Sequence, residues 1–436
     1  MRTFMFSLLI GWLLLLLAAC QIDGADTEES SQQVSSSLTA TPSPSVAPAA
    51  TVVPQGTPPT VTVRVWGPFE LSPQSVGVEG QVLRLQIEEF KSSNSNVNVV
   101  YEPKPISGPA SVLNYVRSAH GVAPTVLPDL IILPLSDFKQ AVQEQLLFPL
   151  DDFVGEGLRN DFYGFTAQLS VDGKLFALPL TVQVEHGVIR DESPRTTLTM
   201  LEELLSDDAP TWLFTGQAHA GGEMSNALLL QLIAINERIP DANNFPSRDK
   251  FVALLTSIQV AQQVGSIPRQ VLSLEESEAL YERLRSGQAD LIESNSRQYM
   301  LERDRKDDIL FTRLPTLTGL FMTVIDGYVI ALTTEEPSQQ QAAVLYLKWL
   351  LESSRLAQWN RAYKGLPARP SSLKNTIDDE GYRKFLVEQL ENGWLRPSGT
   401  NWHDFAQIIQ EQFRAVMLEQ VSPTEAVDTI IEAYAP

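Results

Sequence analysis

The sequence contains few of the residue patterns that catalyse reactions. Its 436 residues include four histidines, at positions 120, 186, 219 and 403, and show neither an HExxH nor a GxSxG motif. His219 and Glu223 are four residues apart, a spacing that could place two metal ligands on one face of a helix. Gly221 and Gly222 between them disfavour a helix, and no third ligand is apparent. We therefore expect no metal, no cofactor and no catalysis.

Charge and loop composition narrow the ligands that the chain could bind. The glycine-rich segment FTGQAHAGGE at 214–223 lacks the lysine and the spacing of a phosphate-binding loop, so we do not expect a nucleotide site. The formal net charge of -21 at pH 7 argues against nucleic acid and against a polyanionic ligand, because phosphates are bound by clustered lysine and arginine. A neutral or cationic solute fits better. A glycoside hydrolase with paired carboxylates stays open as an alternative, because carboxylate separation depends on tertiary structure.

The N-terminal segment has the features of an export signal. Arg2 precedes an apolar run from Phe4 to Leu17, which is too short for a comfortable membrane span. The residues LAAC at 17–20 resemble the lipobox of bacterial lipoproteins, in which the cysteine is acylated and becomes the mature N-terminus. This resemblance predicts a signal peptide at 1–19 and a lipid anchor on Cys20. An ordinary signal peptide with a free thiol is the alternative. Cys20 is the only cysteine, so no disulfide can form within the chain.

Residues 20–59 differ in composition from the rest of the chain. They are rich in serine, threonine and proline and almost free of large apolar side chains. Such a segment cannot bury enough surface to offset the entropy of ordering, and its prolines favour extended conformations. We therefore predict that it is a disordered tether to a globular body. The chain as a whole is 43% hydrophobic and 19% charged, and a body of this length usually divides into two domains.

Strands and helices alternate from residue 61 onward. Val61, Val63 and Val65 alternate with polar residues, which predicts a strand that ends near Trp66. Helices are predicted near 83–90 and 111–119, and strands over 97–101 and 130–133, the last with the continuous apolar run of a strand buried on both faces. This order predicts an α/β lobe with a parallel sheet.

Further helices are predicted in the rest of the chain. They cover 223–235, 251–264 and 275–284, and Ser273 with Glu276 has the spacing of a capping box for the third. The last helix is predicted to begin at Ser422, with a proline at its first position and Glu425 at its third.

Several segments resemble the family 1 extracellular solute-binding proteins of ABC importers, the group that contains the maltose-binding type. They include VTVRVWGP at 61–68, LPDLIILPLSDF at 127–138, VDGKLFALP at 171–179 and the run from PSQQQ at 337 to SSL at 373. The resemblance covers Val61 to Ala435. It implies a type II periplasmic-binding-protein-like fold, with two lobes, each a mainly parallel sheet flanked by helices, and a helical C-terminal segment.

The same resemblance implies where the chain passes between the lobes. It places the first crossing near Pro179 and a return crossing in the segment LRSGQADLIESNSR that ends at Arg297. Lobe 1 is then expected to consist of residues 60–178 and 295–333, and lobe 2 of residues 179–294 and 334–436.

Ligand-binding residues follow from the family pattern, position by position. Sugars need aromatic faces for the C–H side of the ring and amides, carboxylates or guanidinium groups for its hydroxyls. Alternatives stay open for some of them: Trp66 could be a core residue, Glu185 could form a buried ion pair with His186, and Asp326 to Tyr328 could be a turn. Arg297 stands where relatives often carry an aromatic residue, which puts a maltodextrin ligand in doubt. The expected site residues are Trp66, Phe69, Ser136, Gln183, Glu185, Gln217, Asn295, Arg297, Asp326, Tyr328 and Trp402.

The function implied by the resemblance is capture of a small solute, a sugar or oligosaccharide, by closure of the lobes. The expected partners are an ABC permease and the membrane that holds the lipid anchor, and the expected state is a monomer that binds no nucleic acid. The protein would stand on the outer face of the cell membrane, or in the periplasm of a cell with two membranes. A ligand sensor or adhesin that works without a transporter is the alternative.

Overall fold

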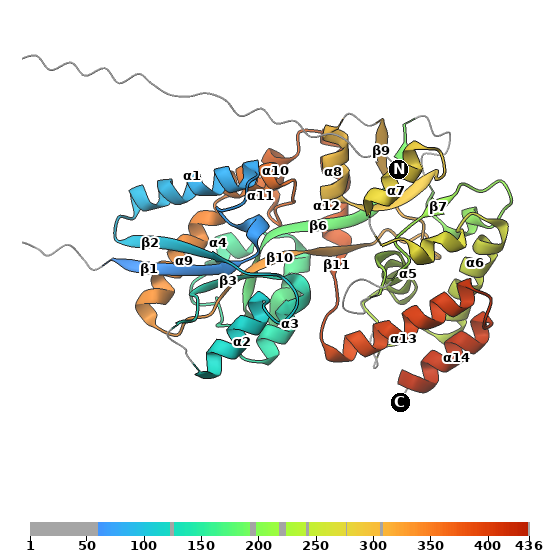
Figure 1. Ribbon diagram of the computed structural model, residues 1–436, viewed down its shortest axis with the longest axis horizontal. Helices are drawn as coiled ribbons and strands as arrows, with labels where there is room; N and C mark the ends of the chain where they lie inside the picture. Colours follow the sequence, from blue (N-terminus) through green and yellow to red (C-terminus); the bar gives the residue numbers. More distant parts are fainter. Residues whose placement is uncertain are drawn as a thin grey trace, which may run out of the picture. The chain divides into compact units, whose positions relative to one another are not determined.

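The computed structural model describes residues 60–122, 126–191, 198–217, 224–240, 244–275, 277–305 and 308–434 (Figure 1). Residues Pro58–Pro436 form one compact unit. The predicted signal peptide, Cys20 and the tether lie outside the described residues, as do His219 and Glu223. No helix within the described ranges has the length and apolar character needed to cross a membrane.

The first lobe begins with three strands whose apolar residues are buried as the sequence predicts. Leu130–Leu133 are fully buried, and the helix that follows the first strand buries Leu83, Ile87 and Phe90. Helix α1 lies on one side of the strands, and α2 and α3 lie on the other (Figure 1). The elements in chain order are β1 (Val61–Gly67), the 3₁₀ helix η1 (Phe69–Leu71), α1 (Val78–Ser93), β2 (Val97–Pro103), α2 (Val112–Val122), β3 (Leu130–Pro134), α3 (Leu135–Gln143), α4 (Glu156–Arg159), η3 (Gly164–Leu169), β4 (Ser170–Val171) and β5 (Lys174–Leu175).

The second lobe follows the long strand β6 (Ala177–Arg190). Its most apolar helix is α5, in which every residue from Asn226 to Ile235 is buried. The elements are η4 (Leu201–Leu204), β7 (Trp212–Leu213), α5 (Asn226–Asn236), α6 (Arg248–Val264), η5 (Arg269–Ser273), α7 (Ser277–Arg285), β8 (Leu291–Asn295), α8 (Ser296–Asp304) and β9 (Ile309–Thr312).

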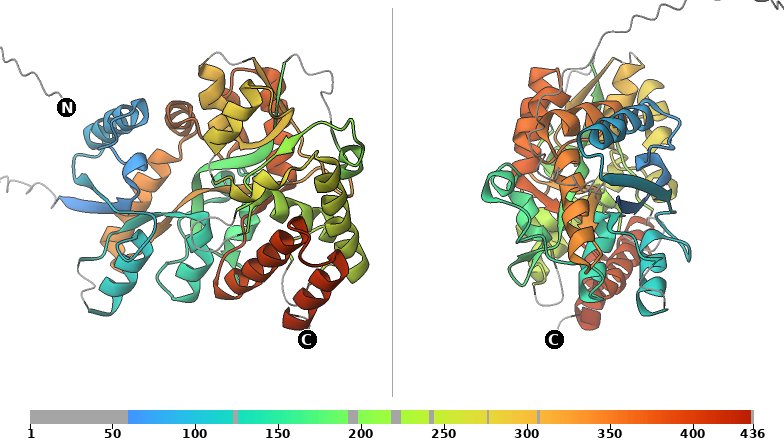
Figure 2. Two further views of the ribbon diagram at one scale, coloured as in Figure 1. Left: turned by 45° about the vertical axis from the view of Figure 1, so that its right-hand side comes forward. Right: turned by 90° about the vertical axis from the view of Figure 1, so that its left-hand side faces the viewer.

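The last third of the chain returns along β10 (Thr323–Leu332) and is mostly helical, as predicted. Helices α13 and α14 pack on each other and on α6 at the far end of the second lobe (Figure 2). The remaining elements are α9 (Pro337–Leu350), α10 (Ser353–Tyr363), α11 (Pro370–Thr376), α12 (Glu380–Asn392), β11 (Gly393–Leu395), α13 (Thr400–Met417) and α14 (Pro423–Tyr434).

One sheet runs through both lobes, in the strand order β2-β1-β3-β10-β6-β8-β7. Strands β1, β2 and β3 are parallel to one another, and β7 is parallel to β8. Strands β6 and β10 join the lobes and run antiparallel to each other. The first part of β6 pairs with β10, and its last part, from Glu185 to Arg190, lies between β8 and β9. The protein therefore has the mixed α/β, two-lobe architecture expected from the sequence.

The course of the chain between the lobes differs from the prediction in two respects. The return crossing is made by β10, whose second half pairs with β3. Among the described strands, β8 pairs with β6 and β7 of the second lobe. Helices α9 and α10 pack mainly against β1 and α1 of the first lobe, although Tyr363 at the end of α10 also contacts Arg297 of α8. The run Asp326-Gly327-Tyr328 lies inside β10, so it is not a turn. The lobe boundaries stay a prediction, and these contacts favour moving residues 337–363 to lobe 1.

Helix capping agrees with the sequence at one of the two predicted positions. The Glu425 amide donates to the Ser422 hydroxyl (3.2 Å), and the Ser422 amide donates back to the Glu425 carboxylate (2.9 Å), which completes a capping box for α14. Ser273 instead donates its hydroxyl to the carbonyl of Gln270 within η5 (2.9 Å). Glu276, the other half of that predicted box, lies outside the described residues.

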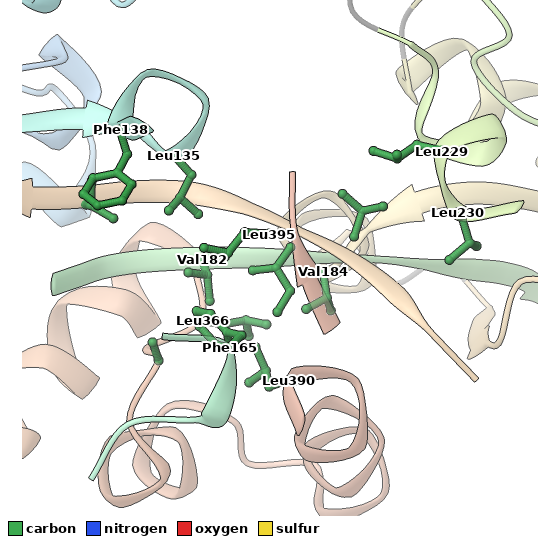
Figure 3. Close-up of a cluster of buried hydrophobic side chains, with 14 of the residues drawn as sticks. Leu135, Phe138, Phe165, Val182, Val184, Leu229, Leu230, Leu366, Leu390 and Leu395 are labelled. Carbon is green, nitrogen blue, oxygen red and sulfur yellow. The ribbon is translucent and has the colours of Figure 1, made fainter. Parts of the chain in front are cut away.

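The two faces of β6 have different surroundings, because successive side chains of a strand point to opposite sides. Val182 and Val184 belong to an apolar cluster with Leu366, Leu390 and Phe165 (Figure 3). Each fully buried aliphatic side chain of this kind contributes about 1.5–3 kcal/mol to the free energy of unfolding. Gln183 and Glu185, which alternate with these residues along β6, therefore face the other side of the sheet.

His186 continues the apolar face of β6. Its Nδ1 donates to the carbonyl of Gly187 (2.9 Å), its Nε2 accepts from the Tyr382 hydroxyl (3.0 Å), and the ring packs edge-on against Tyr299 and Phe385. The alternative in which Glu185 forms an ion pair with His186 is therefore excluded, since the two adjacent side chains point to opposite faces of the strand. Burial lowers the pKa of His186 to about 4, because the charged form loses its hydration.

We expect Gly327→Ala to destabilise the protein by about 1–3 kcal/mol or more. Gly327 lies in β10 with φ at 141°, and an added Cβ would overlap the carbonyl oxygen of Thr181 and lie 2.7 Å from the Cα atom of Val182. Urea denaturation measures the loss. Gly121→Ala is the matched control, because Gly121 is exposed on α2 and has no atom within 4 Å of the added Cβ. Equal stability of the two variants would contradict this account.

We expect His186 to make the protein acid-sensitive between pH 6.5 and pH 4. The unfolded chain binds a proton at this histidine below its ordinary pKa of 6.5, whereas the folded protein excludes it down to about pH 4. Stability therefore falls as the pH falls through this window, by up to about 3 kcal/mol. Chemical denaturation at several pH values should show a smaller loss in His186→Gln than in the wild type. His120→Gln, on the exposed side of α2, should keep the wild-type profile.

Candidate functional site

A cavity of about 540 Å³ lies where the first lobe meets the crossing strands. Its volume is in the range of small-molecule sites in proteins. It is bounded by the loop after β2, the N-terminal parts of α2 and α3, and the middle of β6 and β10. The cavity thus lies at the edge of the sheet where the parallel strands β1, β2 and β3 have their carboxyl ends. The lining residues are Ile106, Ser107, Gly108, Ser111, Leu113, Asn114, Arg117, Pro134, Ser136, Asp137, Gln140, Gln183, Asp326, Gly327, Tyr328 and Arg396.

The side of the cavity formed by α2 and α3 is polar. Arg117 makes a two-pronged ion pair with Glu144, with N–O distances of 2.7 and 2.8 Å. Gln140 donates to the same carboxylate (2.9 Å). The Arg117 guanidinium lowers the pKa of the Glu144 carboxyl, although both groups are partly exposed. These contacts hold the Arg117 guanidinium and the Gln140 amide at the wall of the cavity.

The crossing strands supply the floor of the cavity. Gln183 comes from β6 and pairs with Asp326 of β10, so the two side chains lie on the same face of the sheet. The Gly327 amide donates to Asp326 Oδ1 (2.7 Å). The Tyr328 hydroxyl donates to Glu70 of η1 (2.7 Å), and burial together with the negative charge of Glu70 raises the pKa of Tyr328. Both strands that join the lobes therefore present polar groups to the cavity.

Arg396 stands at the inner end of the cavity although its side chain is only 5% exposed. Its backbone amide donates to the carbonyl of Ile325 (2.9 Å), which fixes the residue beside β10, and its Nε lies 3.4 Å from Asp326 Oδ2. Two further buried carboxylates, Glu185 on β6 and Glu293 on β8, feel the positive charge of Arg396. The floor of the cavity is thus backed by a buried group of charges.

The structure brings four of the predicted ligand-binding residues together. Ser136, Gln183, Asp326 and Tyr328 line the cavity. Glu185 is not in the lining, but it follows Gln183 on the same face of β6 and is buried near Arg396. These residues come from the end of β3, from β6 and from β10.

Two predicted aromatic residues lie outside this lining. Trp66 is buried in the core, with its ring edge-on to Tyr115 and the ammonium group of Lys104 4.7 Å above it. Phe69 lies in η1 and is about half exposed. A ligand role for either residue stays a prediction.

The predicted residues of the second lobe are also outside the lining, and their ligand roles stay predictions. Asn295 caps α8 by accepting from the Gln298 amide (2.9 Å). Arg297 donates to the carbonyl of Tyr363 (3.1 Å), and its guanidinium carbon lies 4.4 Å from the centre of that ring. Trp402 packs on Phe405 at the start of α13. Gln217 is exposed at the end of a described segment.

Sequence reasoning missed part of the lining. Asp137 and Gln140 follow Ser136 on α3, and Ser107, Gly108 and Ser111 follow β2 at the same edge of the sheet. The rule that the ends of parallel strands converge could have found both groups. Nothing in the sequence around Arg396 points to the cavity, because this residue is placed there by the three-residue strand β11 beside β10.

The lining is suited to binding rather than to metal chemistry. Within the part of the chain that the structure describes, no group of three or more His, Cys, Asp or Glu side chains is arranged to hold a metal ion. The lining offers carboxylate, amide, hydroxyl and guanidinium groups, with Tyr328 as its aromatic residue. Such groups pair with the hydroxyls of a polar solute, provided that each is satisfied when water is excluded.

Solved structures with a similar fold are sugar-binding proteins. The cyclic α-maltosyl-1,6-maltose binding protein from Arthrobacter globiformis aligns with a TM-score of 0.72 and 17% identity, over 86% of this chain and 98% of that one. Maltose-bound MalE3 of T. maritima aligns with a TM-score of 0.65 and 18% identity, over 86% and 99%. The sugar-binding protein MalE of the phytopathogen Xanthomonas citri aligns with a TM-score of 0.67 and 17% identity, over 86% and 96%. At these identities the likeness shows a common fold.

Comparison at the level of sequence identifies the family. No curated protein matches the chain. Residues 86–383, more than half of the chain, match the profile of the bacterial extracellular solute-binding proteins, a family defined by binding outside the cell. This chain is therefore a member of the bacterial extracellular solute-binding protein family.

Proposed function

We propose that the protein captures a neutral sugar or oligosaccharide outside the cell and delivers it to an ABC permease without changing it chemically. The observation that carries this proposal is the polar cavity of about 540 Å³ on the two strands that join the lobes. A solute bound there contacts groups that move when the lobes move. No catalytic role is assigned to any residue.

The choice of a sugar has two supports. The lining is rich in groups that pair with hydroxyls, and the net charge of -21 disfavours an anionic solute. The solved structures with the same fold are named for maltose, for a cyclic maltosyl-maltose and for sugar binding in general. The particular sugar is left to experiment, because a shared fold does not carry specificity over from one member to another.

Capture works by closure of the lobes about β6 and β10. A solute held by the first lobe recruits contacts from the second, so it binds the closed form more tightly and shifts the population towards it. The permease then recognises the closed form. The anchor proposed for this protein is a lipid on Cys20, with residues 21–59 as the spacer to the membrane.

We expect one or more neutral sugars to stabilise the protein and to compact it. At a sugar concentration of 100 times Kd, the free energy of unfolding rises by about 2.7 kcal/mol. A thermal-shift screen of maltose, maltotetraose and mannobiose, with spermidine and glycerol 3-phosphate as contrasts, identifies the solute. Small-angle scattering with that solute should show a smaller radius of gyration. Stabilisation by glycerol 3-phosphate alone, or turnover of any sugar, would contradict the proposed function.

We expect Cys20→Ser to release the protein from the membrane. The cysteine is the predicted acylation site, and two or three acyl chains anchor a protein stably. In a bacterial host, the wild type should sediment with membranes and carry the mass of its acyl chains, whereas the variant should not be acylated and should not sediment. Ser30→Ala, which keeps the cysteine, is the control. An unmodified Cys20 in the wild type would contradict the anchor.

A further inference from the structure

Four charged side chains meet behind the floor of the cavity. Glu185 comes from β6, Glu293 from β8, Asp326 from β10, and Arg396 follows β11. Glu185, Glu293 and Arg396 are almost fully buried, and Asp326 is about one-third exposed. Asp326 and Arg396 touch the cavity, whereas the two glutamates lie deeper. The group therefore reaches from the solute site into the sheet of the second lobe.

Glu293 is held firmly but is incompletely paired. The backbone amide and the hydroxyl of Thr215 both donate to its Oε2, each at 3.1 Å. Its Oε1 is buried and makes no hydrogen bond of ordinary geometry among the described residues, although the backbone amide of Ala227 also stabilises the charged carboxylate. A buried carboxylate oxygen without a close partner is costly when the group is charged, and protonation of the carboxyl lowers this cost.

The excess of negative charge in this group also favours a bound proton. Three carboxylates face one guanidinium, and α5, which covers Glu293 with the backbone of Ala227, contains no charged residue. Burial, and then the negative charge of Glu293, raise the pKa of Glu185 well above its ordinary value. Burial raises the pKa of Glu293 to about 7, against the opposing effects of Thr215 and Arg396. Both shifts favour the protonated form of the pair.

We propose that Arg396 and Asp326 contact the hydroxyls of a neutral polyhydroxylated solute, and that the Glu185–Glu293 pair behind them takes up a proton when this solute binds. The inference rests on the proposed function and extends it to the charge of the solute and to its linkage with pH. Arg396 and Asp326 are the contacting groups, and Glu185 and Glu293 are positioning residues that act through Arg396.

The direction of the linkage follows from hydration. A neutral solute in the cavity displaces the water that reaches Asp326 and Arg396, so the charges behind them lose further solvation. Loss of solvation favours the uncharged carboxyl and raises its pKa. The complex then holds more protons than the free protein, and affinity falls as the pH rises from 6 to 8.5. An anionic sugar such as glucuronate adds a negative charge to a group that already has an excess, and it is rejected.

Isothermal titration calorimetry tests the inference with the full-length mature protein and the best-binding neutral sugar among maltose, maltotetraose and mannobiose. Titrations in phosphate and in Tris at one pH give the protons taken up, because the two buffers differ in ionisation enthalpy. We expect net uptake by the wild type at pH 7 to 7.5, and at least a threefold loss of affinity between pH 6 and pH 8.5. Glucuronate should bind at least tenfold more weakly than the neutral sugar.

Two kinds of variant distinguish residues that contact the solute from residues that act through Arg396. Glu293→Gln keeps the shape of the side chain and a neutral state, so it should bind the sugar but show a smaller proton uptake and a flatter pH profile. Arg396→Gln should lose at least tenfold in affinity. Arg361→Gln is the matched control, because Arg361 pairs with Asp378 outside the cavity lining, and it should behave as the wild type. If Arg396→Gln does not fold, Asp326→Asn, at a more exposed position, carries the same test of contact.

Each outcome supports or overturns the inference. Binding without proton uptake, a pH profile unchanged in Glu293→Gln, or wild-type affinity in both Arg396→Gln and Asp326→Asn would overturn it while leaving the proposed function intact. Tight binding of glucuronate would overturn the assignment of a neutral solute. If no neutral sugar binds the wild type, the inference fails together with the sugar part of the proposed function.

Discussion

The hydrogen-bonded pairing of β6 with β10 is the interaction on which the rest of the structure depends. These strands complete the sheet of the first lobe at β3 and extend into the sheet of the second at β8. One face of β6 is apolar and packs on the helices behind it, and the other face carries the polar groups of the cavity. The same residues thus provide the connection between the lobes, part of the core and the floor of the site.

This arrangement explains why charged and polar side chains, whose burial is unfavourable, cluster at the junction of the lobes. A solute site at a joint must be polar, yet the joint must also be packed well enough to hold the lobes together. The protein combines the two by placing His186 and the valines on one side of a single strand and Gln183 and Glu185 on the other. The buried charges near Arg396 are tolerated because the surrounding strands fix their geometry, whereas isolated buried charges would unfold the site.

Local patterns in the sequence predicted much of the fold, and long-range pairing accounts for most of what they missed. The alternation at Val61–Val65, the apolar run at Leu130–Leu133 and the capping box at Ser422 each depend on neighbours in the chain, and the structure contains all three. Strand β10 was harder to recognise, because Asp326 and Gly327 interrupt its apolar pattern and resemble a turn. In the site, the family pattern placed Ser136 and Gln183 after a predicted strand and after the first crossing. Arg396 is brought to Asp326, 70 residues earlier in the chain, by the pairing of the short strand β11 with β10, which no local pattern indicates.

The late position of β10 in the chain has a consequence for biogenesis. Until residue 332 has emerged, β3 is paired on one edge only, with β1, and the first half of β6 has no strand beside it. Unpaired strand edges are templates for pairing with other molecules. Prematurely terminated chains should therefore aggregate, and a chaperone that shields nascent edges during secretion would raise the yield of native protein.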